Sequence, residues 1–398
     1  MLKRVMIVSG ESSGELYGAL LANALKTGNP CISIIGVGGE RMEASGVTLI
    51  SRIAGSFGII EAVKTYGEIK RTFKKVVSAF KSFDPQVLVL IDYPDFNMKV
   101  AGEAKKLGIK VLYYVSPQVW AWRKGRVKTI GTMVDKMAVI LPFEDEIYKN
   151  AGIPCEFVGH PIMDEINEVI QEFGVHDLIT DDLKAKVKQE LGLLPDKPVI
   201  TLMPGSRTHE IKKLIPVMVD VMAEMHRLYP DRQFAIPVAP NLDRNALSVM
   251  SNELKKKNMH HALRITHHAI KTLLASDVAV IASGTSALQA AFLGVPMTVI
   301  YKLSPLTYLI GRLIVKIRHI SLVNVLLDKS VRDDSGLRIK ELLQDRADKD
   351  NIIEELTKIM ENTRYRGEIA AQLNRVRDPF LNKRASLRVA EIIEELGA

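Results

Sequence analysis

The chain has 398 residues, 47% of them hydrophobic, and carries a formal net charge of +8. This length exceeds what one hydrophobic core usually supports, so two domains are expected, and the basic surplus suggests an anionic partner: nucleic acid, an anionic membrane surface or a phosphorylated substrate. The two cysteines, Cys31 and Cys155, lie in different segments without a CxxC or Cys/His spacing, which excludes a disulfide framework and gives no metal signature.

A reducing, cytoplasmic location fits this cysteine usage. Residues 1–10 start with basic residues, but their apolar run is too short for a signal-peptide core and leads directly into Glu11 and Glu15, so we interpret it as a strand. No uncharged apolar run approaches the roughly twenty residues that span a bilayer.

Short β-branched segments alternate with longer helical patterns in the first half of the chain. Such alternation is typical of βαβ units and a parallel sheet. The predicted strands are residues 5–9, 32–37, 87–91, 110–115 and 136–141, and the predicted helices are residues 15–26, 62–83 and 98–107.

After residues 157–161 the pattern changes to a long polar helical stretch over residues 163–191, which indicates a linker. The alternation then restarts, so a second Rossmann-like half is expected, facing the first across a cleft. Its predicted strands are residues 199–203, 233–238, 263–266, 278–282 and 297–301, and its predicted helices are residues 211–228 and 243–257, followed by the last helices over residues 349–397.

The strand at residues 87–91 leads directly into Asp92. In open α/β sheets, ligands bind outside the carboxyl ends of the strands, so a carboxylate at this position is a candidate general base. The alternative is a capping role, in which Asp95 or Asn97 satisfies free backbone N–H groups of the turn and the following helix. We assign the cap to Asp95 and the functional role to Asp92.

The turn after the first strand is rich in hydroxyl and carboxylate groups. It contains Glu11, Ser12, Ser13, Gly14 and Glu15, and it matches neither the GxGxxG nor the P-loop spacing. Because two glutamates would repel phosphate, the turn suits a neutral, hydroxyl-rich ligand such as a sugar. A plain tight turn, with Glu15 favouring the helix N-terminus, explains the same residues.

A turn in the second half has the opposite character. Gly205 permits close backbone approach, Ser206 can hydrogen-bond and Arg207 offers a fork for phosphate oxygens, just before a helix. The turn therefore favours an anion. The alternative is a simple N-cap by Ser206 or Thr208, with Arg207 solvated.

A third turn again joins a buried strand to a helix N-terminus. It presents Ser283, Gly284, Thr285 and Ser286, and either a second anion cradle or a plain N-cap by Ser283 or Thr285 accounts for it. Two anion-binding turns in the second half suggest that it holds a nucleotide-diphosphate donor. The acceptor and the base would come from the first half.

Two sequence motifs are specific enough to suggest a family. They are Asp92-Tyr93-Pro94-Asp95-Phe96-Asn97 and Ser116-Pro117-Gln118-Val119-Trp120-Ala121-Trp122-Arg123. With residues 9–16, 36–42, 57–63, 140–144, 158–161, 202–210 and 283–285, in the same order, they resemble the lipid-A-disaccharide synthases, a family of inverting GT-B glycosyltransferases. The resemblance covers the chain except for its last helices.

The resemblance implies a GT-B fold of two Rossmann-like domains facing a cleft. Residues 1–163 would form the acceptor and base domain, residues 164–375 the UDP-donor domain, and residues 376–398 a helix that packs back across them. The 6-hydroxyl of 2,3-diacylglucosamine 1-phosphate would attack the anomeric carbon of UDP-2,3-diacylglucosamine and give a β-1,6 disaccharide and UDP.

The resemblance also implies roles for particular residues. Asp92 would take the hydroxyl proton, and Arg207 with residues 283–286 would stabilise charge on the departing UDP without a metal or other cofactor. The acceptor or sugar would contact Glu11, Ser12, Ser13, Gly14, Asn97, Trp120 and Arg123, and UDP would contact Gly205, Ser206, Arg207, Ser283, Gly284, Thr285, Ser286 and Gln289.

Two positions and one segment depart from the family pattern. The family usually has Glu, thought to hold the ribose hydroxyls, where this chain has Gln289, whose amide donates and accepts hydrogen bonds but carries no charge. Glu40 stands where Pro is common, and residues 331–337 look like extra length.

Acylated substrates imply contact with a bilayer surface, and two segments suit it. Residues 301–319 are apolar with interleaved cations, and residues 54–66 are apolar and precede a cluster of lysine and arginine. We predict a peripheral enzyme on the anionic inner face of the inner membrane; core helices with a solvated basic edge are the alternative. The membrane or acyl contacts would be Phe57, Ile59, Ile60, Arg312, Lys316 and Arg318.

Other readings of the sequence stay open. Aromatic and basic residues near Trp120 also suit RNA, but a sheet-edge site explains them, so no nucleic acid is expected. The competing functions are a polyprenyl-linked N-acetylglucosaminyltransferase, a UDP-sugar epimerase, or a basic membrane- or RNA-binding module that has lost catalysis. A homodimer is compatible with the sequence.

Overall fold

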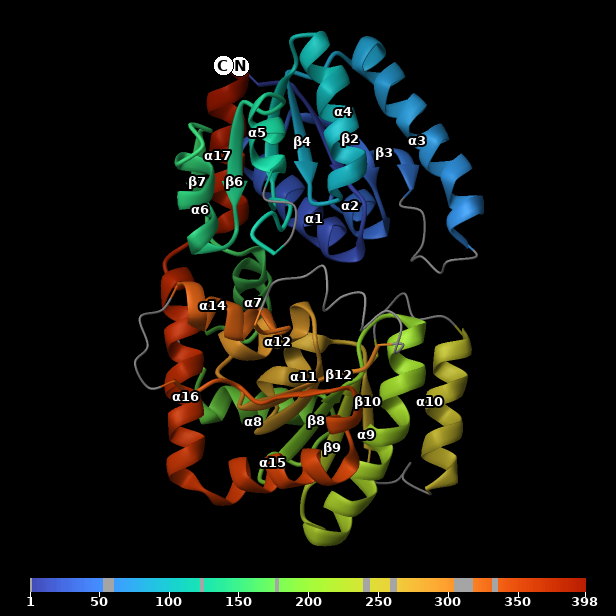
Figure 1. The fold of residues 1–398 in the computed structure, drawn as a ribbon, viewed down its shortest axis with the longest axis vertical. Helices are drawn as coiled ribbons and strands as arrows, with labels where there is room; N and C mark the ends of the chain where they lie inside the picture. Colours follow the sequence, from blue (N-terminus) through green and yellow to red (C-terminus); the bar gives the residue numbers. More distant parts are fainter. Residues whose placement is uncertain are drawn as a thin grey trace. The chain divides into compact units, whose positions relative to one another are not determined.

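The structure is a computed structural model that describes residues 2–52, 61–121, 125–175, 179–238, 244–257, 263–303, 318–330 and 336–398. The chain divides into two compact units: unit 1 comprises Met1–Glu165 and Phe380–Ala398, and unit 2 comprises Ile166–Pro379. The predicted α/β architecture with two parallel sheets is confirmed (Figure 1). Among the described residues, no helix combines the length and the hydropathy needed to cross a membrane.

Unit 1 contains a seven-stranded sheet in the order β3-β2-β1-β4-β5-β6-β7, with every pairing parallel. Central strands such as β4, with the sequence VLVLI, are buried throughout, as expected for parallel strands covered on both faces. The strands are β1 (Arg4–Ser9), β2 (Ser33–Gly38), β3 (Thr48–Arg52), β4 (Val87–Ile91), β5 (Lys110–Tyr114), β6 (Lys136–Val139) and β7 (Cys155–Phe157).

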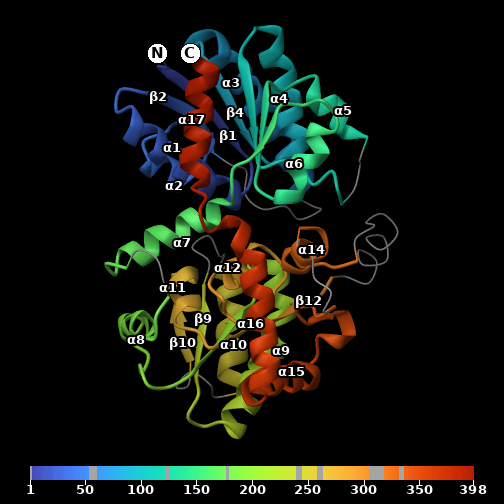
Figure 2. The same cartoon turned by 90° about the vertical axis from the view of Figure 1, so that its left-hand side faces the viewer.

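Helices lie on both faces of the unit 1 sheet. One face packs against α3 and α4 in a core that includes Phe80 and Val100. On the other face α17 lies beside α1 and contacts β4 and β5 (Figure 2). The helices are α1 (Ser12–Gly28), α2 (Glu40–Ala44), α3 (Glu61–Phe83), α4 (Pro94–Lys106), α5 (Arg126–Gly131), α6 (Pro142–Lys149), α7 (Pro161–Gln171), which continues into unit 2, and α17 (Ala385–Gly397).

Unit 2 repeats this topology with a six-stranded parallel sheet in the order β10-β9-β8-β11-β12-β13. The strands are β8 (Val199–Met203), β9 (Gln233–Pro237), β10 (Leu263–Thr266), β11 (Val278–Ala282), β12 (Met297–Tyr301) and β13 (Glu341–Leu343).

In unit 2, α9 packs against both α10 and α15, and α11 packs against α8 and α12. A further helix, α16, packs on α12. The bounds are α8 (Asp181–Glu190), α9 (Thr208–Leu228), α10 (Arg244–Lys256), α11 (Ala269–Leu274), α12 (Thr285–Phe292), α14 (Leu322–Lys329), α15 (Lys349–Glu361) and α16 (Thr363–Arg377), with short 3-10 turns at Gln344–Arg346 and Asp378–Phe380.

The predicted helical stretch over residues 163–191 is wrong as a single element. The structure ends α7 at Gln171, followed by a turn at Gly174, whose φ of +71° favours glycine. A new helix, α8, then begins behind Thr180, whose hydroxyl accepts the Leu183 N–H at 3.2 Å. A helix stop and a fresh N-cap therefore divide the stretch in two.

The last helix belongs to unit 1, although 214 residues of unit 2 precede it in the chain. Val389, Ile392 and Ile393 of α17 are fully buried. Arg388 donates to both carboxylate oxygens of Glu156, at 2.6 and 3.0 Å, and the Ser386 N–H donates to Asp164 at 2.7 Å. A bidentate ion pair at the edge of a buried helix face fixes the position of α17.

Candidate active site

The candidate site of unit 1 lies where the strand order reverses. From β1 the chain continues to β2 on one side of the sheet, and from β4 it continues to β5 on the other side. Ligands of open α/β sheets bind at such a topological switch point. The two strands pair with Ser9 opposite Ile91, so the turn that starts at Gly10 and the residue Asp92 leave the sheet side by side. The structure thus brings together the sugar-binding turn and the base predicted from the sequence.

The backbone of Asp92 is held in an unusual conformation. Asp92 and Tyr93 both have φ of 47°, in the left-handed region, which costs a non-glycine residue about 1–3 kcal/mol. Two buried side chains hold the Asp92 carbonyl oxygen: Asn97 Nδ2 and Tyr113 Oη each donate to it at 2.7 Å. Asn97 Nδ2 also lies 3.2 Å from the Ile91 carbonyl oxygen. The surrounding structure therefore fixes the direction of Asp92.

The environment of Asp92 favours the protonated carboxyl. Burial, and secondarily the Glu11 carboxylate, raise the pKa of Asp92 to about 6, while a hydrogen bond from the Tyr93 backbone N–H opposes the shift. A carboxylate with a pKa close to neutral accepts a proton more readily than an ordinary aspartate, while remaining ionised at pH 7. These are the properties of a general base.

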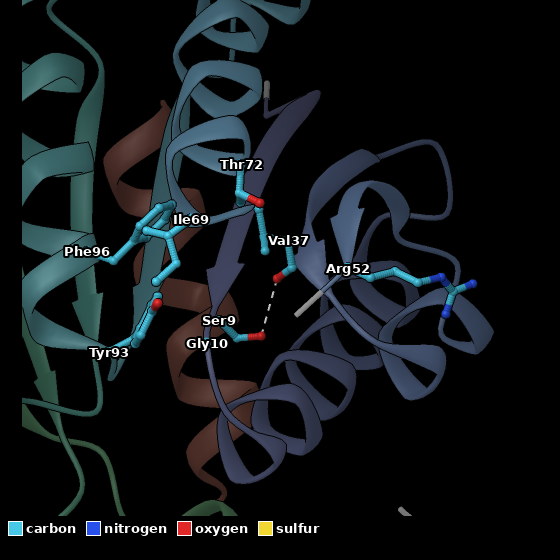
Figure 3. Close-up of a pocket in the computed structure, with 8 residues that line it drawn as sticks. All are labelled: Ser9, Gly10, Val37, Arg52, Ile69, Thr72, Tyr93 and Phe96. Carbon is cyan, nitrogen blue, oxygen red and sulfur yellow. Dashed lines mark hydrogen bonds between the residues drawn. The ribbon is translucent and has the colours of Figure 1, made fainter. Parts of the chain in front are cut away.

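A pocket opens beside this turn (Figure 3). The rings of Tyr93 and Phe96, stacked with centroids 5.2 Å apart, lie on one side and Arg52 on the other, and the Ser9 hydroxyl donates to the Val37 carbonyl at 3.2 Å. The aromatic rings form an apolar wall, whereas the Arg52 guanidinium points away from the pocket and pairs with Glu43 at 2.6 Å. The lining residues are Ser9, Gly10, Val37, Arg52, Ile69, Thr72, Tyr93 and Phe96.

The Tyr93 ring leaves no room for a side chain at Gly10. A Cβ at this position would lie 2.2 Å from Tyr93 Cγ, so Gly10→Ala must displace the ring and the adjacent Asp92. We expect the variant to lose about 1–3 kcal/mol of unfolding free energy, measured by urea denaturation. Gly102→Ala, in α4 where the added carbon meets nothing, is the control and should gain up to about 1 kcal/mol. Equal stability of the two variants would contradict the close packing of Tyr93 on Gly10.

The other residues predicted for the acceptor occupy different environments. In the first turn, Glu11 and Ser12 are exposed, Ser13 is half-buried and Gly14 is buried against the Ile91 side chain. Asn97 is fully buried, with its amide group on backbone carbonyls. Trp120 is 8% exposed, and Arg123 lies outside the described residues.

The predicted capping role of Asp95 is wrong. Tyr93 is the N-cap of α4, Asp95 lies within the first turn, and its carboxylate accepts a hydrogen bond from Arg126 Nη2 at 2.6 Å. The left-handed Tyr93 and the proline at the first helical position leave no cap position for Asp95.

Besides the residues that line the pocket, Tyr113 and Glu144 were missed in the sequence. In the sequence Tyr113 looks like an ordinary core residue of a buried strand, but its hydroxyl donates a hydrogen bond to the Asp92 carbonyl oxygen. Glu144 reads as the acidic first turn of a helix, yet it is 2% exposed and accepts hydrogen bonds from Ser116 and Trp120. A sequence signal existed only for Glu144, which lies within a segment that resembles the family.

The switch point of unit 2 falls between β8 and β11, where Met203 pairs with Ile281. The turns at residues 204–207 and 283–284, both predicted to bind an anion, therefore leave adjacent strands. Gly205 has φ of +98°, and a Cβ there would lie 2.4 Å from Glu210 Oε2, so this turn requires glycine.

Arg207 stands at the N-terminus of α9 with an exposed side chain. It is the N-cap residue, so neither Ser206 nor Thr208 fills that position. The Arg207 N–H donates to Glu210 Oε2 at 3.4 Å, and the guanidinium lies 3.9 Å from the same carboxylate. A half-exposed guanidinium at a helix N-terminus can reach a phosphate from this position.

In the third turn, Gly284 is the N-cap of α12, so neither Ser283 nor Thr285 fills that position. Gly284 and Thr285 are exposed, Ser286 is half-buried, and space around the Gly284 Cα is open. Gln289 lies one helical turn after Thr285 in α12 and is 9% exposed.

Within the described part of the chain, no group of three or more His, Cys, Asp or Glu is arranged to hold a metal ion.

Comparison with known proteins gives a consistent result. The profile of a family described as lipid-A-disaccharide synthetase matches residues 5–393. A lipid-A-disaccharide synthase of Geobacter sulfurreducens is 38% identical over 396 residues, covering 99% of this chain and 97% of that protein. One from Coxiella burnetii is 35% identical over 400 residues and covers 99% and 98%.

Solved structures resemble the fold at low sequence identity. UDP-GlcNAc 2-epimerase from Neisseria meningitidis, bound to UDP-GlcNAc, has a TM-score of 0.64 at 12% identity and covers 98% of both chains. The glycosyltransferase of kitacinnamycin has a TM-score of 0.62 at 13% identity and covers 100% of both. These similarities establish the two-domain GT-B fold.

Proposed function

Since this chain belongs to the lipid-A-disaccharide synthase family, we propose that it joins UDP-2,3-diacylglucosamine to 2,3-diacylglucosamine 1-phosphate. Membership makes the protein a glycosyltransferase of lipid A disaccharide synthesis; the acylated substrates and the inverting course are the proposal. The product is a β-1,6-linked disaccharide 1-phosphate and UDP. An α linkage in the product, read from the anomeric proton coupling in NMR, would contradict inversion.

The observation that carries the mechanism is the buried Asp92 at the unit 1 switch point. As the acceptor 6-oxygen bonds to the anomeric carbon, the bond to UDP breaks and its electron pair moves to the β-phosphate oxygen. The 6-hydroxyl proton passes to the Asp92 carboxylate. Its raised pKa and its fixed backbone support this role, because a positioned base near neutral pKa contributes most to proton transfer.

Unit 2 supplies the donor contacts in this proposal. The N–H groups around residues 205–207 and 284–286 and the Arg207 guanidinium bind the diphosphate and stabilise the charge that develops as UDP departs. Gln289 hydrogen-bonds the ribose hydroxyls in place of the glutamate usual in the family. Both turns follow adjacent strands, β8 and β11, at the switch point of unit 2, which supports this assignment.

The reaction should depend on the protonation state of Asp92. Because only the ionised carboxylate accepts a proton and its pKa is about 6, kcat/KM should fall about tenfold per pH unit below pH 6 and level off above it. Initial rates from about pH 4.5 to 8 measure this profile. A plateau that continues down to about pH 4, as an ordinary carboxyl would give, would contradict the assignment of Asp92 as the base.

We further propose that the protein contacts an anionic bilayer peripherally, because both substrates carry acyl chains. Of the residues assigned to this contact, Arg318 is exposed, and Phe57, Ile59, Ile60, Arg312 and Lys316 lie outside the described residues. Neutralising Arg312, Lys316 and Arg318 together should reduce co-sedimentation with anionic vesicles and leave neutral vesicles unaffected. Unchanged sedimentation with anionic vesicles would contradict the contact.

A further inference from the structure

Glu144 of α6 is a buried carboxylate without a role in the reaction proposed above. It is 2% exposed, and three hydrogen-bond donors converge on it. Ser116 Oγ and Trp120 Nε1 donate to Oε1 at 2.8 and 3.1 Å, and the Leu141 N–H donates to Oε2 at 3.3 Å. All three partners donate, which favours the ionised carboxylate, whereas burial opposes ionisation and raises the pKa of Glu144 to about 7.

The donors come from two separate loops at the carboxyl end of the unit 1 sheet. Ser116 and Trp120 belong to the loop of residues 115–121 after β5, and Leu141 follows β6. The loop starts at Val115, whose φ of 65° places a β-branched residue in the left-handed region. Such a bend persists only where neighbouring contacts hold it, and Glu144 supplies two of those contacts.

This loop lies next to Asp92. β5 pairs with β4 so that Tyr114 is opposite Ile91, and the Asp92 N–H points to the Tyr114 carbonyl at 3.3 Å. The Trp120 ring also packs edge-on against Phe143, with centroids 5.3 Å apart. One carboxylate and one aromatic ring therefore hold the Trp120 indole within the loop that begins next to the candidate base.

We propose that Glu144 is a positioning residue that holds the loop of residues 115–121 in the shape that binds the acceptor beside Asp92. The inference rests on the proposed transfer reaction. Because the Trp120 N–H is engaged by Glu144, Trp120 offers the acceptor its ring rather than its N–H. Glu144 itself does not touch the substrate.

Glu144→Gln tests the proposal, with Glu146→Gln on the exposed face of the same helix as the matched control. A glutamine can keep its oxygen toward Ser116 and Trp120, but its NH2 group then meets the Leu141 N–H, donor against donor. We expect the KM for the acceptor to rise about tenfold while UDP affinity, measured by calorimetry, stays within about twofold. The control should leave both values unchanged.

The conformation of the loop of residues 115–121 can also be followed by NMR, independently of turnover. The chain has two tryptophans, so ¹H–¹⁵N spectra show two indole signals, and Trp120→Phe identifies that of Trp120. The Trp120 signal should move in Glu144→Gln and stay in Glu146→Gln. If Glu144→Gln does not fold, Ser116→Ala, which keeps the buried carboxylate, should show the same changes at smaller amplitude.

An unchanged acceptor KM together with an unmoved Trp120 signal in the folded variant would overturn the proposal. A parent protein that makes no disaccharide would instead contradict the proposed reaction. In that case the Trp120 signal still decides whether Glu144 holds the loop.

Discussion

Replacing Asp92 with asparagine should lower turnover by about 10²–10⁴-fold, the usual contribution of a general base, while UDP binding stays at the parental level. The amide keeps the shape of the carboxyl but cannot accept a proton from the 6-hydroxyl. Asparagine also tolerates the left-handed φ of 47° at this position, so the backbone is preserved. Product formation by mass spectrometry and UDP affinity by calorimetry give the two readouts.

The same variant should be at least as stable as the parent. The folded-state pKa of Asp92, about 6, lies above the ordinary value of 3.8, so the native state binds the proton more tightly than the unfolded chain. Ionisation of Asp92 at pH 7 therefore costs the native state stability, by about 3 kcal/mol for two pKa units. Asparagine removes that cost. A loss of activity caused by unfolding would appear as a lower urea midpoint, which the account does not expect.

Asp84→Asn is the matched control for this variant. Asp84 precedes β4 as Asp92 follows it, and it has a similar φ of 49°, but its side chain is 79% exposed and pairs with Arg4. We expect parental turnover from Asp84→Asn. Parental turnover from Asp92→Asn would contradict the assigned base.

Replacing Arg207 with glutamine should lower kcat/KM by about 10²–10³-fold and also weaken UDP binding, unlike the Asp92 change. The guanidinium is the cation that unit 2 places at the N-terminus of α9, beside the turn at Gly205. Arg207→Lys keeps the charge without the planar fork and should recover only part of the loss. Steady-state rates at varied donor concentration measure both effects.

Arg227→Gln is the control for the Arg207 variants. Arg227 lies in the last turn of the same helix, where it pairs with Glu224 at 2.6 Å on an exposed surface. Removing this pair should change neither the rate nor UDP affinity. Equal effects of the Arg207 and Arg227 changes would show that Arg207 acts through overall charge rather than through a phosphate contact.

The central strands and the longer helices, such as α3 and α9, could be predicted because their sequences carry strong local patterns. Residues 87–91 and 278–282 are unbroken apolar runs, which only a strand buried on both faces explains well. Three edge strands were missed, because a strand paired on one side needs no such run: Thr48–Arg52, Cys155–Phe157 and Glu341–Leu343. In Thr48–Arg52 the three central residues are only partly buried and the two end residues are exposed, and the other two strands are three residues long.

The candidate site could be predicted only as far as chain topology determines it. Asp92 and the glycine turns follow directly from strands, so their meeting at the switch points is a consequence of parallel order. The conformation of Asp92 could not be predicted, because aspartate tolerates positive φ but, unlike a glycine in a tight turn, does not signal it. Asn97 was taken for a sugar contact, but two backbone carbonyls hold its amide group in the core.

The most direct test of the account is disaccharide formation measured by mass spectrometry. One reaction contains UDP-2,3-diacylglucosamine and 2,3-diacylglucosamine 1-phosphate, and a second contains unacylated UDP-N-acetylglucosamine with the same acceptor. We predict disaccharide 1-phosphate and UDP in the first reaction and no disaccharide in the second. Absence of disaccharide in both reactions, with UDP still bound by the protein, would contradict the proposed transfer.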